Sequence, residues 1–323
     1  MNASASCRFS VVIPLYNKAL FVAKGIRSVL EQSHQNFELI VIDDGSTDGS
    51  ADVVREFRDD RIRLVSQTNQ GVSAARNRGI HEAKYDLIAF LDADDWWSVD
   101  YLLEMSRLIE AHPDLSLFCA PYAHVVGGRV KHVTNAVACE SRHAIFDPLE
   151  ASVRCGSFLL PFYPSSAVVR ASILQKAGFF DPAIGYYEDY DLFIRIALHT
   201  RCGCVVGNPL VFYNKDVPAF QRATGRLPPI ERSLVGHLDK LILLESLHSS
   251  LSEYIDTFLL FNLMAYVEEG YPARAVKPLL ASVDPRRFTM LHKLYYSYSP
   301  LGRLSVRLNV LRRRLVGLSQ GRI

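Results

Sequence analysis

The sequence predicts an α/β fold with a mostly parallel central sheet and helices on its faces. Short runs rich in Val, Ile and Leu alternate with amphipathic stretches through the first 120 residues, a pattern typical of βαβ units. Polar and acidic residues directly follow several of these runs. Because ligands bind beyond the carboxyl ends of the strands in such sheets, these polar residues are the first candidates for a site.

Five short runs rich in apolar and β-branched residues are the expected strands of the first 120 residues. The strands cover Phe9–Pro14, Phe37–Asp43, Ile62–Ser66, Asp86–Asp92 and Leu115–Ala120. The helices expected between them begin after polar residues and end before turn-forming ones. They cover Ala19–Gln32, Ser50–Phe57, Val72–Lys84 and Tyr101–His112. These elements predict one half of a doubly wound sheet.

The pattern becomes less regular after residue 120. Gly127-Gly128 predicts a hairpin turn, and the stretch from there to about Pro164 shows no clear period. The elements expected next are a strand at Ser166–Arg170, a short helix to Lys176, a helix at Glu188–His199, and strands at Gly203–Val206 and Leu210–Asn214. We expect this domain to end near residue 227, before Pro228-Pro229.

A helical extension is expected over residues 228–323. The prolines expected to mark its helix boundaries are Pro272, Pro278, Pro285 and Pro300. Leucines from Leu301 to Leu318 form one helical stripe with arginines around it. A helix of this kind can bind the anionic inner face of a membrane, pack on the core or form a homodimer seam. The sequence leaves these three roles open.

The composition excludes several classes of protein. Lys and Arg number 36 against 34 for Asp and Glu, so no overall charge favours nucleic acid. The six cysteines contain no C-x-x-C pair and are too few for a disulfide scaffold. No window is apolar enough for a membrane helix, and the N-terminus lacks the pattern of a signal peptide. We therefore expect a cytoplasmic protein.

A run of acids, Asp92-Ala93-Asp94-Asp95, follows the expected strand that contains Leu87 to Leu91. Carboxylates crowded at one strand end favour a divalent cation, and Mg²⁺ or Mn²⁺ takes its remaining ligands from phosphates and water. The alternative is that Asp94 or Asp95 caps a helix that begins near Trp97.

A second acidic run, Asp43-Asp44-Gly45-Ser46-Thr47-Asp48, closes the expected strand at Phe37–Asp43. Ser46 or Asp48 is expected to cap the next helix. Asp43 and Asp44 stand where an acid can accept hydrogen bonds from the base or ribose of a nucleoside.

Two further motifs carry charged residues at the start of helices. The stretch Asn69 to Gly79 combines small residues with two arginines, which suits the approach of a phosphate but equally a solvated basic face. Tyr186 to Asp191 places acids in a first helical turn, where the helix dipole alone favours them. A reaction of two substrates also needs such an acid as a general base.

Taken together, these motifs resemble those of the family 2 glycosyltransferases with a GT-A fold. The matching stretches occur in the same order as in that family: IPLYN, IDDGSTDGS, NQGVSAARNRGI, IAFLDADD, AGFFD and YYEDYDLFIRI. They extend from about Phe9 to Tyr213. The resemblance implies a nucleotide-binding half at about residues 1–120 and an acceptor-side half at about 121–227.

The resemblance also implies the ligands and the site residues. Family members bind a nucleotide-diphosphate sugar, here expected to be a UDP-sugar, with Mn²⁺ or Mg²⁺, and invert the anomeric centre. The residues implied to line the nucleotide and donor sugar are Pro14, Tyr16, Asn17, Asp43, Asp44, Gly71, Arg76, Asn77, Asp92 and Ala93. Asp94, with Asp92 beside it, is implied as the metal ligand. Asp189, next to Glu188, is implied as the general base.

The chain departs from the family pattern at one place. Many relatives have a histidine or basic residues after the last core strand, whereas this chain has Tyr213-Asn214-Lys215-Asp216. Lys215 or Arg222 can replace the missing charge, but neither replaces a histidine ligand. The resemblance implies that the acceptor is a glycan or a lipid-linked sugar of a surface polysaccharide or glycolipid pathway.

Two other functions fit parts of the sequence. An Mg²⁺-dependent phosphotransferase would use Asp92 as its nucleophile, but it leaves the second acidic run unexplained. A catalytically silent module would bind the nucleotide sugar without turning it over. Dinucleotide oxidoreductases and P-loop enzymes are excluded, because neither G-x-G-x-x-G nor G-x-x-x-x-G-K-[ST] occurs.

Overall fold

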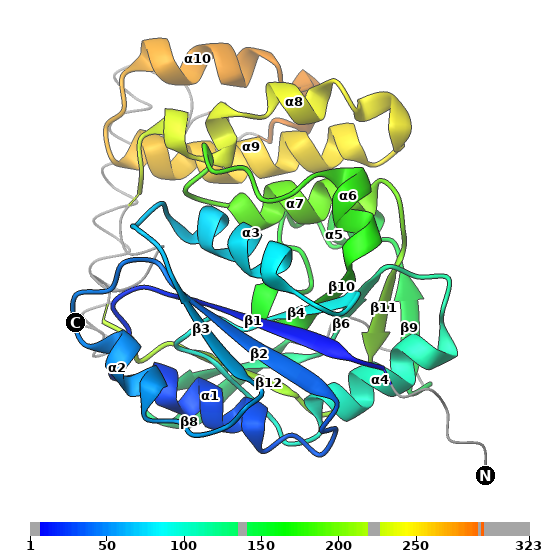
Figure 1. The fold of residues 1–323 in the computed structure, drawn as a ribbon. Helices are drawn as coiled ribbons and strands as arrows, with labels where there is room; N and C mark the ends of the chain where they lie inside the picture. Colours follow the sequence, from blue (N-terminus) through cyan, green and yellow to red (C-terminus); the bar gives the residue numbers. More distant parts are fainter. Residues whose placement is uncertain (1–6, 135–140, 219–226, 290–291, 294–323) are drawn as a thin grey trace. The chain divides into compact units, whose positions relative to one another are not determined.

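The computed structural model describes residues 7–134, 141–218, 227–289 and 292–293 (Figure 1). The chain divides into two compact units. The first comprises Met1–Ala151, Leu160–Pro228 and Arg232–Leu234, and the second comprises Ser152–Leu159, Pro229–Glu231 and Val235–Ile323.

The first unit is built on a sheet of eight strands. In spatial order these are β3 (Ile62–Ser66), β2 (Phe37–Asp43), β1 (Phe9–Leu15), β4 (Leu87–Phe90), β10 (Ala167–Arg170), β6 (Leu117–Cys119), β11 (Cys202–Val205) and β9 (His143–Phe146). The strands β3, β2, β1 and β4 are parallel, as are β6 and β11, whereas β10 and β9 run antiparallel to their neighbours. The expected α/β fold with a mostly parallel sheet is confirmed.

A second, smaller sheet belongs to the same unit. Its strands are β5 (Trp96–Trp97), β12 (Val211–Asn214), β7 (Tyr122–Val126) and β8 (Arg129–Thr134). The hairpin turn predicted at Gly127-Gly128 joins β7 to β8, and both glycines have positive φ. The backbone N–H groups of both glycines donate to the Asp216 carboxylate, at 2.7 and 3.0 Å. The stretch that was expected to be irregular therefore contains strands.

Helices cover both faces of the main sheet (Figure 1). Their bounds are α1 (Val22–Leu30), α2 (Ser50–Arg55), α3 (Val72–Glu82), α4 (Tyr101–Ala111), α5 (Pro148–Arg154), α6 (Ala171–Ala177) and α7 (Glu188–Ala197). Apolar residues of α1, α2 and α4 form the larger core with one face of β1, because alternate strand residues point to it. The helix α3 packs on the opposite face, where Ala75 contacts Ile40 and Ile42.

The described part of the second unit is helical, as expected. It contains α8 (Asp239–Ile242), α9 (Leu251–Glu268) and α10 (Ala273–Ala281). Short 3₁₀ turns occur in both units at η1 (Pro164–Ser166), η3 (Ile230–Arg232), η4 (Leu234–Gly236), η5 (Glu245–Leu247) and η6 (Pro285–Arg287). No helix among the described residues is long and apolar enough to cross a membrane.

Two of the expected proline boundaries are correct and one is wrong. Pro272 directly precedes α10, and Pro285 begins η6. Pro278 lies inside α10. The expectation was wrong because a helix can continue past a proline, although the proline removes one hydrogen bond and its ring crowds the preceding turn. Pro300 and the leucine stripe from Leu301 to Leu318 lie outside the described residues.

Candidate active site

The carboxyl ends of β1, β2 and β4 meet at one edge of the main sheet because the three strands are parallel. The loops that follow these strands hold most of the predicted site residues. Pro14 lies within β1, and Asp43 is the last residue of β2. Tyr16, just beyond β1, is 48% exposed, so its ring is accessible to a ligand at this edge.

Asp44 organises the loop that leads into α3. Its buried carboxylate accepts hydrogen bonds from the backbone N–H groups of Gln70 and Gly71, at 2.9 and 2.8 Å. The Gln67 side chain adds a third bond at 2.8 Å. Gly71 has a φ of 90°, which favours glycine. Asp44 therefore shapes the loop in addition to its predicted contact with a nucleoside.

The loop after β1 is held by the loop after β2. The backbone N–H of Asn17 donates to Ser46 Oγ at 3.1 Å, and Asn17 Oδ1 accepts from the Thr47 N–H at 2.8 Å. Asp43 accepts from the Ser46 N–H at 3.0 Å. These bonds explain how Asn17, a non-glycine residue, is held at a φ of 50°.

The N-cap residue of α2 is Gly49, which has no side-chain cap, so neither Ser46 nor Asp48 is the cap that was expected, although Asp48 contacts the start of this helix. Its Oδ1 accepts from the backbone N–H of Ser50, the first residue of α2, at 3.0 Å. Its Oδ2 accepts from the Ala19 N–H at 3.0 Å. Burial opposes ionisation of Asp48, but the hydrogen bonds from Ser50 and Ala19 outweigh it, and the pKa of Asp48 is lowered.

The last acid of the run after β4 has a structural role. Asp95 is 1% exposed, and it accepts hydrogen bonds from the hydroxyls of Tyr163 and Ser165 at 2.9 and 2.7 Å. The Asn214 N–H donates to it at 3.0 Å. Burial, reinforced by Asp94 and Asp92, raises the pKa of Asp95 well above its usual range.

The alternative that Asp94 or Asp95 caps a helix near Trp97 is wrong. Trp96 and Trp97 form the strand β5, and α4 begins only at Tyr101. The hydrogen bond from Asn214 ties Asp95 to β12, the strand that pairs with β5. A two-residue strand carries too little periodicity to be recognised in a sequence.

Asp94 forms an ion pair that the sequence did not indicate. Its Oδ2 lies 2.5 Å from Lys18 Nζ, and the two side chains are 19% and 13% exposed. Burial raises the pKa of Asp94, and the Lys18 charge partly offsets this effect. Lys18 directly follows the IPLYN motif, but only the pairing of β1 with β4 brings its loop to Asp94.

Arg76 joins Asp92, one of the acids after β4, to Glu188 of α7. Its buried guanidinium donates to Asp92 Oδ1 and to Glu188 Oε1, both at 2.8 Å, and lies 5.2 Å from the centre of the Phe180 ring. Burial disfavours the charged form, but the carboxylates of Asp92 and Glu188 outweigh it and raise the pKa of Arg76. Two motifs separated by about half of the unit's sequence thus meet at one side chain.

Asp189 lies beside this bridge, in the first turn of α7. The helix begins after Tyr187, whose φ is 63°. Burial raises the pKa of Asp189 to about 7, with a further contribution from Glu188 that Arg76 partly offsets. A carboxyl group with a pKa near neutrality is suited to take up a proton at the working pH of an enzyme.

Asn77 and Ala93 are held within the protein. The Asn77 side chain donates to the Phe180 carbonyl at 2.8 Å and accepts from the Phe180 N–H at 3.0 Å. It therefore links α3 to the segment before α7, which is an additional role beside the predicted nucleotide contact. Ala93 is 3% exposed, so a ligand would meet its backbone rather than its side chain.

The acids after β4 fit a metal that takes most of its ligands from a substrate. No group of three or more His, Cys, Asp or Glu side chains suited to a metal occurs among the described residues. Asp92 and Asp94 are the hard oxygen donors that Mg²⁺ and Mn²⁺ prefer, and one or two carboxylates suffice when phosphates and water complete the shell. Lys215 lies over the Tyr213 ring, 4.2 Å from its centre, and Arg222 lies outside the described residues.

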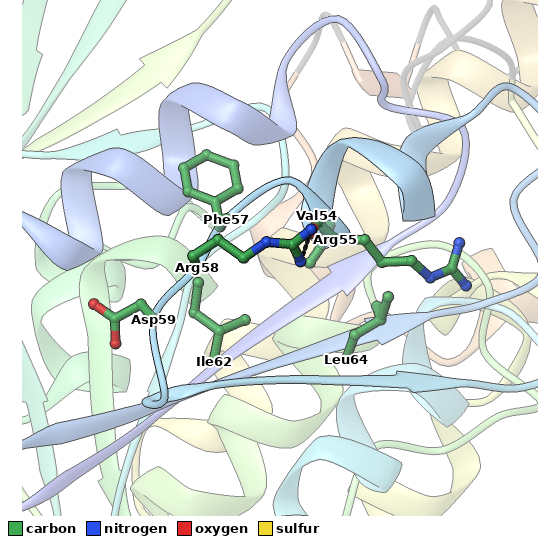
Figure 2. Close-up of a pocket in the computed structure, with 7 residues that line it drawn as sticks. All are labelled: Val54, Arg55, Phe57, Arg58, Asp59, Ile62 and Leu64. Carbon is green, nitrogen blue, oxygen red and sulfur yellow. Dashed lines mark hydrogen bonds between the residues drawn. The ribbon is translucent and has the colours of Figure 1, made fainter.

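A separate hollow of about 380 Å³ lies between α2 and β3 (Figure 2). It is lined by Val54, Arg55, Phe57, Arg58, Asp59, Ile62 and Leu64. None of these is a predicted site residue. Ile62 and Leu64 lie before the carboxyl end of β3, which is at Ser66. The hollow is therefore distinct from the acid-rich edge.

Comparison with known proteins points to one family. The family model described as "Glycosyl transferase family 2" matches residues 10–176. A glycosyltransferase of Haemophilus influenzae is 38% identical over 131 residues, which is 39% of this chain and 52% of that protein. Glycosyltransferase GlyA of Streptococcus pneumoniae is 34% identical over 113 residues, 34% of this chain and 16% of that protein. The match thus covers about half of these relatives or less.

Solved structures share the fold. S. aureus TarS 1-349 in complex with UDP-GlcNAc superposes with a TM-score of 0.75 at 17% identity, covering 94% of this chain and 92% of that one. The mannosyltransferase PcManGT from Pyrobaculum calidifontis, in complex with GDP-Man and Mn²⁺, gives a TM-score of 0.56 at 20% identity, covering 98% and 83%. At these identities the likeness concerns the architecture, which is the GT-A fold.

Proposed function

The chain belongs to glycosyl transferase family 2, and on this basis we propose that it transfers a sugar from a nucleotide-diphosphate sugar to an acceptor hydroxyl, with inversion. The observation that supports this most directly is the bridge from Asp92 through Arg76 to Glu188. It brings the acid of α7 beside the acids after β4, as a reaction between a donor and an acceptor requires.

In the proposed reaction Asp189 accepts the proton of the acceptor hydroxyl. The acceptor oxygen then forms a bond to the anomeric carbon as the bond from that carbon to the diphosphate breaks. The electron pair leaves with the nucleoside diphosphate, and a single displacement inverts the configuration. A divalent metal held by Asp94 and Asp92 would supply positive charge to the diphosphate leaving group.

We propose a UDP-sugar as the donor, with Mn²⁺ or Mg²⁺. The TarS structure that shares the fold contains UDP-GlcNAc, while the PcManGT structure contains GDP-Man and Mn²⁺, so both nucleotides belong in a donor screen. The nucleoside would lie against Tyr16, Asp43 and Asp44 at the edge of the sheet. The acceptor would be a glycan or a lipid-linked sugar used in surface polysaccharide or glycolipid assembly.

We assign catalysis to residues 1–227 and contact with a membrane or a second copy to the extension 228–323. Sedimentation with anionic vesicles and measurement of the molar mass in solution distinguish these two contacts. Binding to vesicles by the monomer supports a peripheral location at the inner membrane face. A dimer that ignores vesicles supports a homodimer seam.

The test of the proposed activity is the release of free nucleoside diphosphate from a panel of nucleotide sugars, with Mn²⁺ or with chelator. The wild type is compared with Asp94→Ala and Asp189→Ala. We expect metal-dependent release from one or two donors, and its loss in both variants. Donor binding by calorimetry without turnover, even with acceptors present, would instead indicate a catalytically silent binding module.

A further inference from the structure

Lys18 forms an ion pair with Asp94, the residue that is predicted to bind the metal. The two charged atoms lie 2.5 Å apart, and both side chains are mostly buried. The positive charge of the ammonium group opposes the approach of a second cation to the same carboxylate. A divalent metal therefore binds Asp94 more favourably if Lys18 moves away.

The main chain around Lys18 is fixed by the first residue of α2 and by the loop that precedes it. Its backbone N–H donates to Ser50 Oγ at 2.8 Å, and the next residue, Ala19, donates to Asp48 at 3.0 Å. The side chain, in contrast, has four rotatable bonds between this anchor and its charge. Exchange of Lys18 for a metal thus requires a change of side-chain rotamer and no movement of the backbone.

Each acid of the run after β4 has a partner of its own. Arg76 pairs with Asp92, and hydroxyl and backbone donors hold Asp95. Lys18 is the partner of Asp94, with its Nζ 2.5 Å from Asp94 Oδ2. An ammonium ion and a divalent cation at one carboxylate would repel each other.

We propose that Lys18 is a built-in counter-ion of Asp94 that competes with the divalent metal and so sets the metal affinity of the free protein. This inference rests on the metal site of the proposed function. It assigns to Lys18 a positioning role, because the ammonium group holds the Asp94 side chain in place until a metal arrives. It also predicts that removal of the lysine charge strengthens metal binding.

The test measures the binding of Mn²⁺ to the full chain in the absence of any nucleotide-sugar donor. The electron paramagnetic resonance signal gives the concentration of free Mn²⁺. We compare the wild type with Lys18→Met and with Lys18→Gln, which keeps a hydrogen-bond donor for Asp94 and protects folding. Lys24→Met is the matched control, since Lys24 has the same charge but lies over the Trp96 ring, 2.9 Å from its centre. Both Lys18 variants should bind Mn²⁺ about tenfold more tightly, and Lys24→Met should bind as the wild type does.

Thermal unfolding gives a second readout. Without metal, the Lys18 variants should melt below the wild type, and Mn²⁺ should raise their melting temperature more than it raises that of the wild type. Equal or weaker Mn²⁺ affinity in the Lys18 variants would overturn the counter-ion role alone. Absence of Mn²⁺ binding in every variant, with or without nucleoside diphosphate, would overturn the metal site itself.

Discussion

Arg76 is the residue through which the two halves of the candidate site meet. A buried cation between two carboxylates is costly to remove from one side only, because the acids then remain without compensation. Arg76→Met should lower the free energy of unfolding by about 3 kcal/mol, as measured by urea denaturation. Arg76→Lys should recover only part of this loss, since an ammonium group lacks the fork that reaches both acids.

The control for Arg76 is Arg78→Met in the same helix. The Arg78 side chain is 49% exposed and pairs with Glu82 on the surface, so its removal should change stability little. A similar loss in both variants would show that the helix is sensitive to any substitution. It would contradict the importance of the bridge.

The ionisation of Asp189 should make both the turnover rate and the stability of the protein depend on pH. With a pKa of about 7 in the folded protein, the carboxyl is protonated below neutrality, so the turnover rate should rise as pH increases through about 7. Because this folded-state pKa lies above the usual value of an aspartate, the folded state holds the proton more tightly than the unfolded state. Its ionisation therefore lowers stability as pH rises from about 4 to above 7.

Asp189→Asn should consequently abolish transfer and yet stabilise the fold. At pH 8 we expect a gain on the order of 1 kcal/mol in the free energy of unfolding, and at pH 4 we expect almost none. The exposed Asp114→Asn provides the control at both pH values. A wild type whose rate does not depend on pH between 6 and 8 would exclude Asp189 as the titrating base.

At the scale of elements, the contact between α3 and β1 positions Arg76. Gly79 lies where a Cβ atom would come within 2.2 Å of Val12. Gly79→Ala should therefore force α3 away from the sheet and destabilise the protein by about 1–3 kcal/mol. The melting temperature measures this effect.

The same substitution should also reduce activity in the surviving folded protein, because α3 carries Arg76 to its two acids. Val12→Ala gives the matching test, since it removes the methyl groups that the new side chain would strike. The double variant should be more stable than the sum of the two single changes predicts. Strict additivity would show that Gly79 and Val12 do not constrain each other.

At the scale of the whole molecule, the sequence predicted the first 120 residues closely. The strands β2 and β3 begin and end where expected. The strand β2 is buried along its whole length and reads as a nearly continuous apolar run, whereas β3 is a partly buried edge strand. The segment after residue 120 was harder, because β9 and its neighbours are short and their composition is mixed. Nothing local distinguishes such strands from loops.

In the candidate site, too, some residues could be predicted from the sequence and others could not. Asp43, Asp44, Asp92 and Asp94 could be predicted as site residues because they stand at or just after strand ends, a position that a sequence reveals, and their roles stay predictions. Lys18 and the forked contacts of Arg76 were not found, because they depend on strand order and on packing between segments far apart in the chain. Pairing partners of this kind follow from the fold and not from any local pattern.

The buried Asp95 has a consequence for how mutants of this chain are interpreted. An alanine scan through the acidic run would treat its three aspartates as equivalent, although Asp95 holds Tyr163, Ser165 and Asn214 in place. Asp95→Ala should reduce the yield of folded protein, so its inactivity would say nothing about chemistry. Only losses at Asp92 and Asp94 that leave the yield and the melting profile intact would report on donor or metal binding.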